Sequence, residues 1–364
     1  MIYSKENPRR RRELCVKVTM EQIANTVGVS RGTVDRALHG RAGVNPQIAE
    51  QIITVAKQLG YRASFDIKPL RRQKKLILGF VLREGRGVWA DMMAGIERAA
   101  AELAEYHVEI IVRRFAGYKP ENELLCINEI MNQGIDGLAV APINDARVKA
   151  RLTEITASGI PVVLVNQEMN GAEEVGALCY FGSDYLLAGR TAAGMLKLCH
   201  TPGRIELGVF CASKNMFSQS TRITGFLQEI DRLNLNCHLI DLLNFSRGTD
   251  GSQALGTYDL ALAFLKKHPE ITAVYTVGGQ SGAVATAIYD SGRAGEIIHI
   301  TFDMHQSNLE GLQNGSITVL IGQESVAQGY QPLKILYDYC ANGVAPQSSR
   351  ILVKSEIIIP QNAF

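Results

Sequence analysis

The chain has 364 residues, 46% of them hydrophobic and 20% charged, with a formal net charge of +2. This balance excludes a mostly disordered or fibrous protein, and the length exceeds one compact core, so we expect more than one domain. No segment approaches the roughly 18–20 apolar residues of a membrane span. The arginines at 9–12 are not followed by the apolar segment of a secretory signal. We therefore expect a soluble, cytoplasmic protein without a membrane partner.

The small net charge hides an asymmetry along the chain. Residues 1–75 carry 16 basic and 6 acidic side chains, a net of +10, whereas residues 76–364 carry a net of −8. This distribution predicts a polyanionic partner for the N-terminal part, although a basic tail can also be merely solvated. The seven cysteines form no C-x-x-C pair and the histidines show no metal-ligand spacing, so we expect neither disulfides nor a metal or cofactor.

Capping residues mark the first predicted helix. Thr19, followed by Gln22 three positions later, is a capping box, and it predicts a helix that begins at Met20. Gly28 is able to adopt a left-handed backbone conformation, which ends a helix sharply. The sequence therefore predicts a short helix followed by a tight turn.

Two more helices are predicted immediately afterwards. Ser30 is a second N-cap, which opens a helix over residues 31–38. Asn45 caps a third helix, with Pro46 at its first position, and apolar residues recur there at helical spacing until Gly60. Three closely spaced caps of this kind predict a small bundle of three helices.

The first two helices have the spacing of a DNA-binding helix-turn-helix, in which the small Ala24 permits a close crossing. In that motif the second helix enters the major groove with its N-terminal end first. Arginine pairs well with guanine or phosphate, and cap residues can donate to phosphates. The predicted DNA contacts in this region are Thr19, Ser30, Arg31, Gly32, Thr33, Arg36 and Asn45. The alternative is an unrelated three-helix bundle with the same caps.

The segments VTMEQIANTVGVSRGTVDRAL and HGRAGVNPQIAEQIITVAKQLGY resemble the start of the LacI/GalR family of bacterial repressors. A weaker similarity extends over about residues 18–360. The resemblance implies four parts: a basic, disordered leader (1–17), a helix-turn-helix DNA-binding domain (18–61), a hinge (62–75) and a two-lobed effector-binding domain (76–364).

The hinge contains one residue for which the resemblance implies a specific role. In the family this segment forms a short helix on DNA, and a leucine from each of two subunits enters the minor groove; Leu70 occupies that position. Pro69 directly precedes it, and proline inside a helix removes a hydrogen bond and disfavours helix at Lys68. A flexible linker with phosphate-binding basic residues is therefore the alternative.

From residue 76 onward, short apolar runs alternate with segments of helical periodicity. The runs cover 76–82, 108–112, 137–142, 161–166, 205–210, 237–243, 273–277, 297–302 and 318–322. Such alternation predicts parallel sheets covered by helices on both faces, and some 285 residues of it predict two lobes. The expected fold is thus an N-terminal all-α helix-turn-helix domain followed by an α/β, two-lobed domain that resembles type I periplasmic binding proteins.

The resemblance also implies an effector site between the two lobes. Sugar hydroxyls need planar partners such as Asp, Asn, Arg and Gln, and a sugar's apolar face needs an aromatic ring. The residues at the positions of the family's ligand contacts are Trp89, Asn144, Arg222, Asp303 and Gln323, and Asn144 stands where sugar binders carry an Asp. Each also has a plain alternative role, in the core, as a loop cap, in a surface ion pair or at a hinge between lobes.

Other positions in residues 76–364 bear on this predicted site. We expect Asp303 at a lobe crossing and Gln323 at the third crossing, whereas Asp184 is expected to be a helix N-cap. Gly278 and Gly279 stand where many relatives have an Asn-Asp pair, which leaves the identity of the sugar open.

Together these patterns favour a transcriptional regulator, most simply a repressor, that binds operator DNA as a homodimer or dimer of dimers under control of a sugar-like effector. No catalytic residues are expected. Two other functions remain open: a solute-binding protein without a DNA role, and a sugar-modifying enzyme on the same fold.

Overall fold

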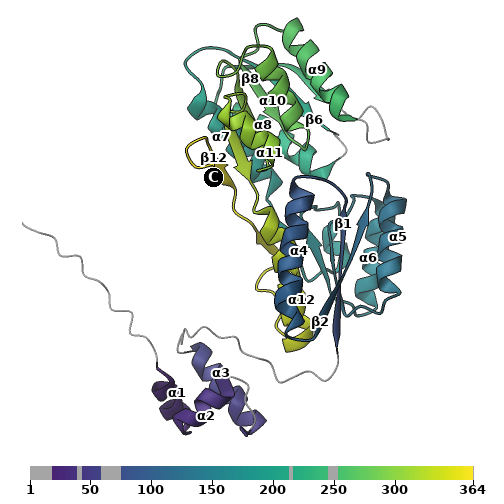
Figure 1. Cartoon of the computed structure of the whole chain (residues 1–364), viewed down its shortest axis with the longest axis vertical. Helices are drawn as coiled ribbons and strands as arrows, with labels where there is room; N and C mark the ends of the chain where they lie inside the picture. Colours follow the sequence, from purple (N-terminus) through teal and green to yellow (C-terminus); the bar gives the residue numbers. More distant parts are fainter. Residues whose placement is uncertain (1–18, 39–42, 59–74, 213–215, 245–252, 364) are drawn as a thin grey trace, which may run out of the picture. The chain divides into compact units, whose positions relative to one another are not determined.

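The computed structural model describes residues 19–38, 43–58, 75–212, 216–244 and 253–363. The chain divides into two compact units, residues 1–73 and 74–364 (Figure 1). The predicted leader, Leu70 and all of the predicted hinge except its last residue lie outside the described residues. Among the residues that are described, no helix is both long and apolar enough to cross a lipid bilayer.

The N-terminal unit is a bundle of the three predicted helices, α1 (Met20–Val27), α2 (Arg31–Leu38) and α3 (Pro46–Gln58). The capping box at Thr19 is present, and Gly28 ends α1 with a φ of 77° in the left-handed region. The buried side chains of its core are apolar and come from all three helices: Ile23, Ala24, Val34, Ala37, Leu38, Ile52 and Ala56. The local caps therefore produce a bundle with its own core, as the sequence predicts.

The C-terminal unit contains two six-stranded sheets, each covered by helices, which we call the first and second lobes. The first sheet has the order β11-β5-β4-β3-β1-β2 and pairs in parallel throughout. Its strands are β1 (Leu76–Arg83), β2 (Val108–Phe115), β3 (Gly137–Val140), β4 (Val162–Val165), β5 (Cys179–Gly182) and β11 (Arg350–Leu352). Its helices are α4 (Val88–Ala104), α5 (Pro120–Met131), α6 (Ala146–Ala157), the short η1 (Ala172–Val175) and α12 (Ser325–Asn342).

The second sheet has the order β12-β10-β9-β8-β6-β7. Its strands are β6 (Ile205–Cys211), β7 (Cys237–Asn244), β8 (Ala273–Thr276), β9 (Ile298–Phe302), β10 (Val319–Gly322) and β12 (Glu356–Ile358). Its helices are α7 (Tyr185–Cys199), α8 (Phe217–Arg232), α9 (Gln253–Lys267), α10 (Ser281–Asp290) and α11 (Gln306–Gln313). Every strand that the apolar runs predict is present, and Asp184 caps α7 by accepting from the Leu187 N–H.

The structure adds three strands that the apolar runs did not predict: β5, β11 and β12. One of them corrects the expectation of purely parallel sheets, because β12 pairs antiparallel with β10. The chain passes between the lobes after β5, after β10 and after β11. Gln323 therefore lies at the second crossing rather than the third. Asp303 lies between β9 and α11 of the same lobe, so its expected place at a crossing was wrong.

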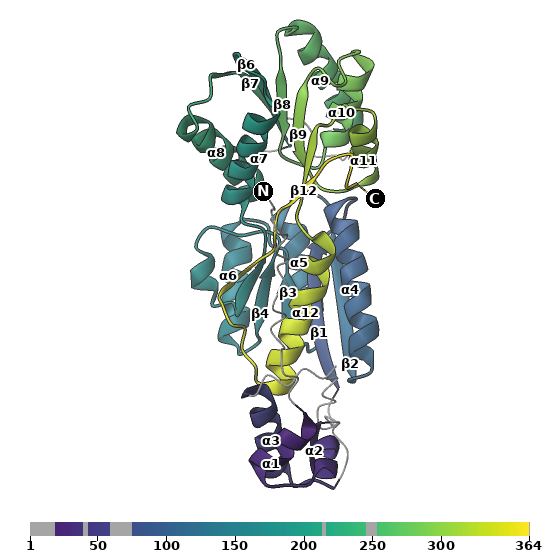
Figure 2. The ribbon, with the colours of Figure 1, turned by 90° about the vertical axis from the view of Figure 1, so that its left-hand side faces the viewer.

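Close helix pairs support each lobe. In the first lobe α4 and α12 run side by side (Figure 2), and glycines stand where their backbones meet. A Cβ on Gly95 would overlap the carbonyl oxygen of Val326, and one on Gly329 would overlap that of Met92. The two helices can approach this closely only because neither carries a side chain at the contact.

In the second lobe, α7 and α8 form an equivalent pair. A Cβ on Gly189 would overlap the carbonyl oxygen of Arg222, and one on Gly225 would overlap that of Leu186. The backbone at Arg222 is therefore held directly against α7, which fixes the start of a side chain that the sequence places in the effector site.

Candidate functional site

The N-terminal end of α2 carries most of the predicted DNA contacts. Arg31 and Gly32 are exposed there. Ser30 Oγ accepts from the Thr33 N–H at 3.1 Å and lies 2.9 Å from Thr33 Oγ1, so the two hydroxyls fix the start of the helix. Arg36 is also exposed, and its Nε donates to the Gly32 carbonyl at 3.1 Å. Helix α2 therefore begins at a formed cap and exposes two guanidinium groups, those of Arg31 and Arg36.

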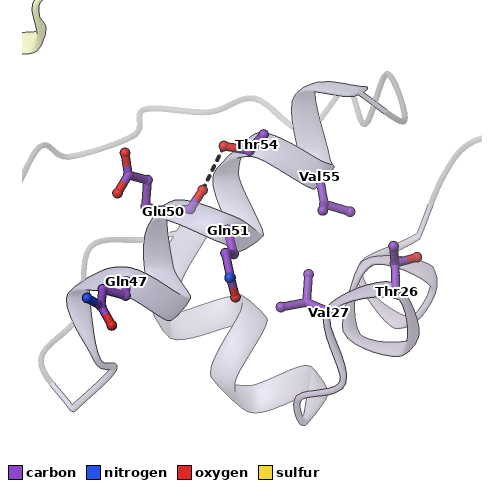
Figure 3. A pocket seen from close by; sticks show the side chains of 7 residues that line it. All are labelled: Thr26, Val27, Gln47, Glu50, Gln51, Thr54 and Val55. Atoms are coloured by element: carbon purple, nitrogen blue, oxygen red, sulfur yellow. Dashed lines mark hydrogen bonds between the residues drawn. The ribbon is translucent and has the colours of Figure 1, made fainter.

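The cap of α3 is also formed, and a surface hollow lies beside this helix. Asn45 Oδ1 accepts from the Gln47 N–H at 2.9 Å. The hollow opens between α1 and α3 and is lined by Thr26, Val27, Gln47, Glu50, Gln51, Thr54 and Val55 (Figure 3). None of these seven is a predicted DNA contact.

Three of the five predicted effector residues lie together in the C-terminal unit. Gln323 Nε2 donates to Asp303 Oδ1 at 2.5 Å, and Gln323 Oε1 accepts from Arg222 Nη2 at 3.3 Å. Gln323 is only 6% exposed, and Ser183 at the first lobe crossing also donates to its Oε1, at 3.2 Å. This cluster, Arg222–Gln323–Asp303, joins the second lobe to two of the three lobe crossings.

Arg222 is the cation of this cluster and is 4% exposed. Its guanidinium lies 3.8 Å from the centroid of the Phe302 ring and 5.0 Å from that of Tyr185. Its Nη1 donates to the Val277 carbonyl at 3.4 Å, whereas its Nε is buried without a partner among the described residues. Buried donors are nearly always satisfied, so this guanidinium N–H is free to donate to a ligand or to an ordered water.

Asp303 adopts a backbone conformation that suits a site rather than a strand. Its φ is 73°, in the left-handed region, which non-glycine residues occupy rarely. Asn308 stabilises this turn, because its Nδ2 donates to the carbonyls of Phe302 and Asp303 at 2.8 and 2.9 Å. The turn directs the chain away from β9 at the carboxyl end of the strand, where ligands of open α/β sheets bind.

Trp89 and Asn144 make no contact with the Arg222–Gln323–Asp303 cluster in the described structure. Trp89 is 9% exposed and packs in the core of the first lobe beside Met92 and Ile96. Asn144 Oδ1 accepts from the Asn170 N–H at 2.8 Å, which ties together two loops of the first lobe.

A buried carboxyl group supports the loop that carries Asn144. Glu123 on α5 is completely buried, and its Oε2 accepts from the Ile143 N–H at 2.8 Å. Its Oε1 has no partner among the described residues, and burial raises its pKa to about 8. Glu123 therefore lies protonated at neutral pH beneath the β3–α6 loop.

The structure adds titratable groups that the sequence reasoning missed. Burial and the neighbouring Asp303 carboxylate raise the pKa of Asp91, at the start of α4. Burial lowers the pKa of His305, while the charges of Asp303 and Asp91 oppose that effect. A Cβ on Gly87 would lie 3.2 Å from Cδ2 of the same histidine ring. The beginning of α4 in the first lobe therefore lies against His305 in the second.

Arg83 and Tyr118, which the sequence reasoning also missed, lie at the carboxyl edge of the first sheet. Arg83 is the last residue of β1, and its guanidinium lies 4.1 Å from the centroid of the Tyr118 ring and 5.0 Å from that of Trp89. Strand-end position is the signal that could have identified Arg83, since polar groups at that edge are the usual ligand contacts.

Comparisons with known families match both parts of the chain. Residues 19–64 match the family described as bacterial regulatory proteins, lacI family, and residues 78–343 match a periplasmic binding protein domain. The second match covers most of the chain.

Three of the individual relatives share only 22–25% sequence identity with this chain. The regulator AglR of Rhizobium meliloti is 25% identical over 43% of this chain and 44% of its own length. GalS of Salmonella typhimurium is 22% identical over 76% of this chain and 77% of its own. The ribose operon repressor of Haemophilus influenzae is 24% identical over 66% and 69%. The matches to AglR and to RafR of Escherichia coli span less than half of those relatives.

Solved structures of the same fold agree with the two-lobed architecture. A LacI regulator from Bacteroides fragilis superposes with a TM-score of 0.70 at 19% identity, covering 79% of this chain and 98% of its own. GanP, a glucose-galactose binding protein from Geobacillus stearothermophilus, superposes with a TM-score of 0.68 at 21% identity, covering 80% and 99%. The chain therefore belongs to the periplasmic binding protein domain family and carries, before that domain, a helix-turn-helix domain of the lacI family of bacterial regulatory proteins.

Proposed function

We propose that the chain is a DNA-binding transcriptional repressor whose operator affinity is controlled by a sugar or related polyol. The Arg222–Gln323–Asp303 cluster carries this proposal. It joins a cation, an amide and a carboxylate at the lobe crossings, and these are the groups that bind vicinal hydroxyls. An effector that contacts this cluster would bind the two lobe arrangements unequally, which is the requirement for coupling to DNA.

The DNA-binding part of the proposal rests on α2. Arg31 and Arg36 are exposed on this helix, as base or phosphate contacts require. A homodimer, or a dimer of dimers, would place two such helices on a near-palindromic operator in the cytoplasm. The DNA contacts further comprise the caps Thr19, Ser30 and Asn45, the residues Gly32 and Thr33, and the hinge leucine Leu70.

Two measurements on the full chain test this function. Filter binding to promoter DNA at several salt concentrations should give retention that falls steeply as salt rises, because counterions are released when basic side chains bind phosphates. A thermal-shift screen against sugars and polyols should find a compound that raises the melting temperature, since a ligand of the folded state alone stabilises it.

The outcomes separate the alternative functions. A compound that raises the melting temperature and also changes DNA retention supports an effector-controlled regulator. Sugar binding without salt-dependent DNA retention supports a solute-binding protein. Turnover of a sugar or sugar phosphate in the absence of DNA supports an enzyme and contradicts the proposal.

A further inference from the structure

Arg83 is a half-buried cation that forms no ion pair in the described part of the chain. It ends β1 at the carboxyl edge of the first sheet, and its Nε is buried without a hydrogen-bond partner among the described residues. The ion pairs found in the described part of the chain do not include it. Leaving a partly buried charge uncompensated is costly, so an anionic group of a ligand that pairs with this guanidinium would stabilise the complex.

Aromatic rings shape the surroundings of this guanidinium. Arg83 lies over the rings of Tyr118 and Trp89, which hold it by cation–π contact and restrict its orientation. Trp89 is buried, whereas Tyr118 is 48% exposed. Burial lowers the pKa of Arg83, and the Tyr118 phenol is the group that opposes this effect; no carboxylate does. The guanidinium is therefore oriented by rings and not neutralised by an acid.

The carboxylates of the region belong to a different part of the site. The Asp303 carboxylate raises the pKa of Asp91, and both carboxylates act on the pKa of His305, whereas neither is among the causes of the lowered pKa of Arg83. Asp303 is also bonded to Gln323, which reaches Arg222 in the second lobe. The carboxyl edge of the first sheet thus offers a cation without an ion pair among the described residues, and the cluster in the second lobe offers carboxylate, amide and guanidinium groups suited to hydroxyls.

From this division of charge we infer that the effector is an anionic polyol, a sugar acid or a sugar phosphate, whose acidic group is bound by Arg83. The inference rests on the proposed function and narrows it to one ligand class. The planar guanidinium pairs bidentately with carboxylate or phosphate, and the hydroxylated part of the ligand would then extend towards Asp303 and Gln323.

The test compares neutral and acidic forms of the same sugars on the full chain. Titration calorimetry uses D-glucose, D-galactose, D-gluconate, D-galactonate and the two hexose 6-phosphates. We expect an acidic member to bind at least about tenfold more tightly than its neutral counterpart, since a hydrogen-bonded charge pair contributes roughly that factor or more. Preference for the aldonates or for the phosphates distinguishes a carboxylate from a phosphoryl group.

Variants then assign the preference to one residue. Arg83→Gln should remove most of the preference for the acidic form, because it should weaken binding of the acid much more than binding of the neutral sugar. Arg83→Lys, which keeps the charge but not the planar fork, should give an intermediate loss. Arg98→Gln is the matched control, because Arg98 is also stacked on a tyrosine, Tyr330, but lies further along α4 and is exposed.

Each outcome is decisive. Neutral sugars that bind as tightly as their acids in the unmodified chain overturn the anionic effector while leaving the sugar-responsive function intact. An unchanged preference in Arg83→Gln removes Arg83 from the site. If no member of the series binds, both this inference and the polyol effector fail. If the melting temperature shows that Arg83→Gln does not fold, the affinities of the unmodified chain and of Arg83→Lys for acidic and neutral sugars still test the inference.

Discussion

Gln323 Nε2 donates a hydrogen bond of 2.5 Å to Asp303 Oδ1, and this bond connects the end of β9 to the segment by which the chain leaves the second lobe. The same amide accepts from Arg222 at 3.3 Å. A ligand that bonds to Asp303 or Arg222 must therefore compete with the lobe crossing for the same polar atoms. Occupancy of the site and the geometry of that crossing are for this reason linked.

The first prediction concerns Arg222→Ala and Asp303→Ala. Each should weaken effector binding by about tenfold to a hundredfold, since hydrogen bonds to charged groups contribute roughly 1.5–3 kcal/mol. Operator affinity without effector should stay within about threefold of the unmodified chain. Calorimetry and filter binding measure the two quantities. Asp290→Ala, an exposed carboxylate on α10 bonded to Tyr258, is the control and should change neither. An effector response that persists in both cluster variants would show that the effector binds elsewhere.

The second prediction concerns the start of α2. Arg31→Ala should reduce operator affinity by about 1–3 kcal/mol and affinity for random DNA by less, because a base contact is specific and a phosphate contact is not. Filter binding with operator and random duplexes over a salt series measures both. Gln51→Ala, in the hollow between α1 and α3, should leave both affinities unchanged. Equal losses on the two duplexes would make Arg31 a phosphate contact.

The third prediction uses two glycines of α7. Gly189→Ala should lower the free energy of unfolding by about 1–3 kcal/mol, because the new methyl group overlaps the Arg222 carbonyl on α8. Gly194 has nothing within 4 Å of an added Cβ, so Gly194→Ala should stabilise the protein by about 0.5–1 kcal/mol through helix propensity. Urea unfolding measures both. Similar effects of the two substitutions would contradict the close contact of α7 with α8.

The fourth prediction follows from Glu123, whose folded pKa of about 8 lies above its ordinary value of 4.5. Between these two pH values the unfolded chain releases a proton that the folded chain keeps. The contribution of Glu123 to the free energy of unfolding should therefore be fully present below about pH 4.5 and fall as pH rises towards 8, by at most about 1.4 kcal/mol per pH unit.

Glu123→Gln tests this dependence, because it keeps an oxygen that can accept from Ile143 and removes the titration. Urea unfolding from pH 5.5 to 8.5 should show a flatter profile in this variant than in the unmodified chain. Glu121→Gln, on the exposed surface of the same helix, should retain the original slope. Parallel profiles for Glu123→Gln and the unmodified chain would mean that Glu123 does not hold its proton.

The sequence predicts those parts of the structure that are determined by residues close to one another along the chain. The caps at Thr19, Ser30 and Asn45 are formed by bonds that reach two or three residues along the chain. The longer strands also follow directly from continuous apolar runs. By contrast, β11 has three residues and pairs with β5, about 170 positions earlier, so no local pattern marks it.

The same distinction applies to the candidate site. Arg222, Asp303 and Gln323 match family motifs, and the fold brings them together. The neighbourhood of Asp91 and His305 could not be read from the sequence, because it arises from the approach of two elements more than 200 residues apart. Trp89 packs in the same core as Met92 and Ile96, and its ring lies beside the Arg83 guanidinium, so its contact with a ligand stays a prediction.

The pairing of α4 with α12 has a mechanical consequence. Helix α12 begins two residues after Gln323 and extends over 18 residues, or about 27 Å. Near its far end, Cys340 Sγ lies 3.4 Å from the Asp136 carbonyl, and the Asp136 carboxylate accepts from the Ile77 N–H at 2.8 Å. Ile77 is the second residue of β1, where the polypeptide enters this domain. A displacement of Gln323 along the axis of α12 would thus be transmitted through Cys340 and Asp136 to the first residues of β1.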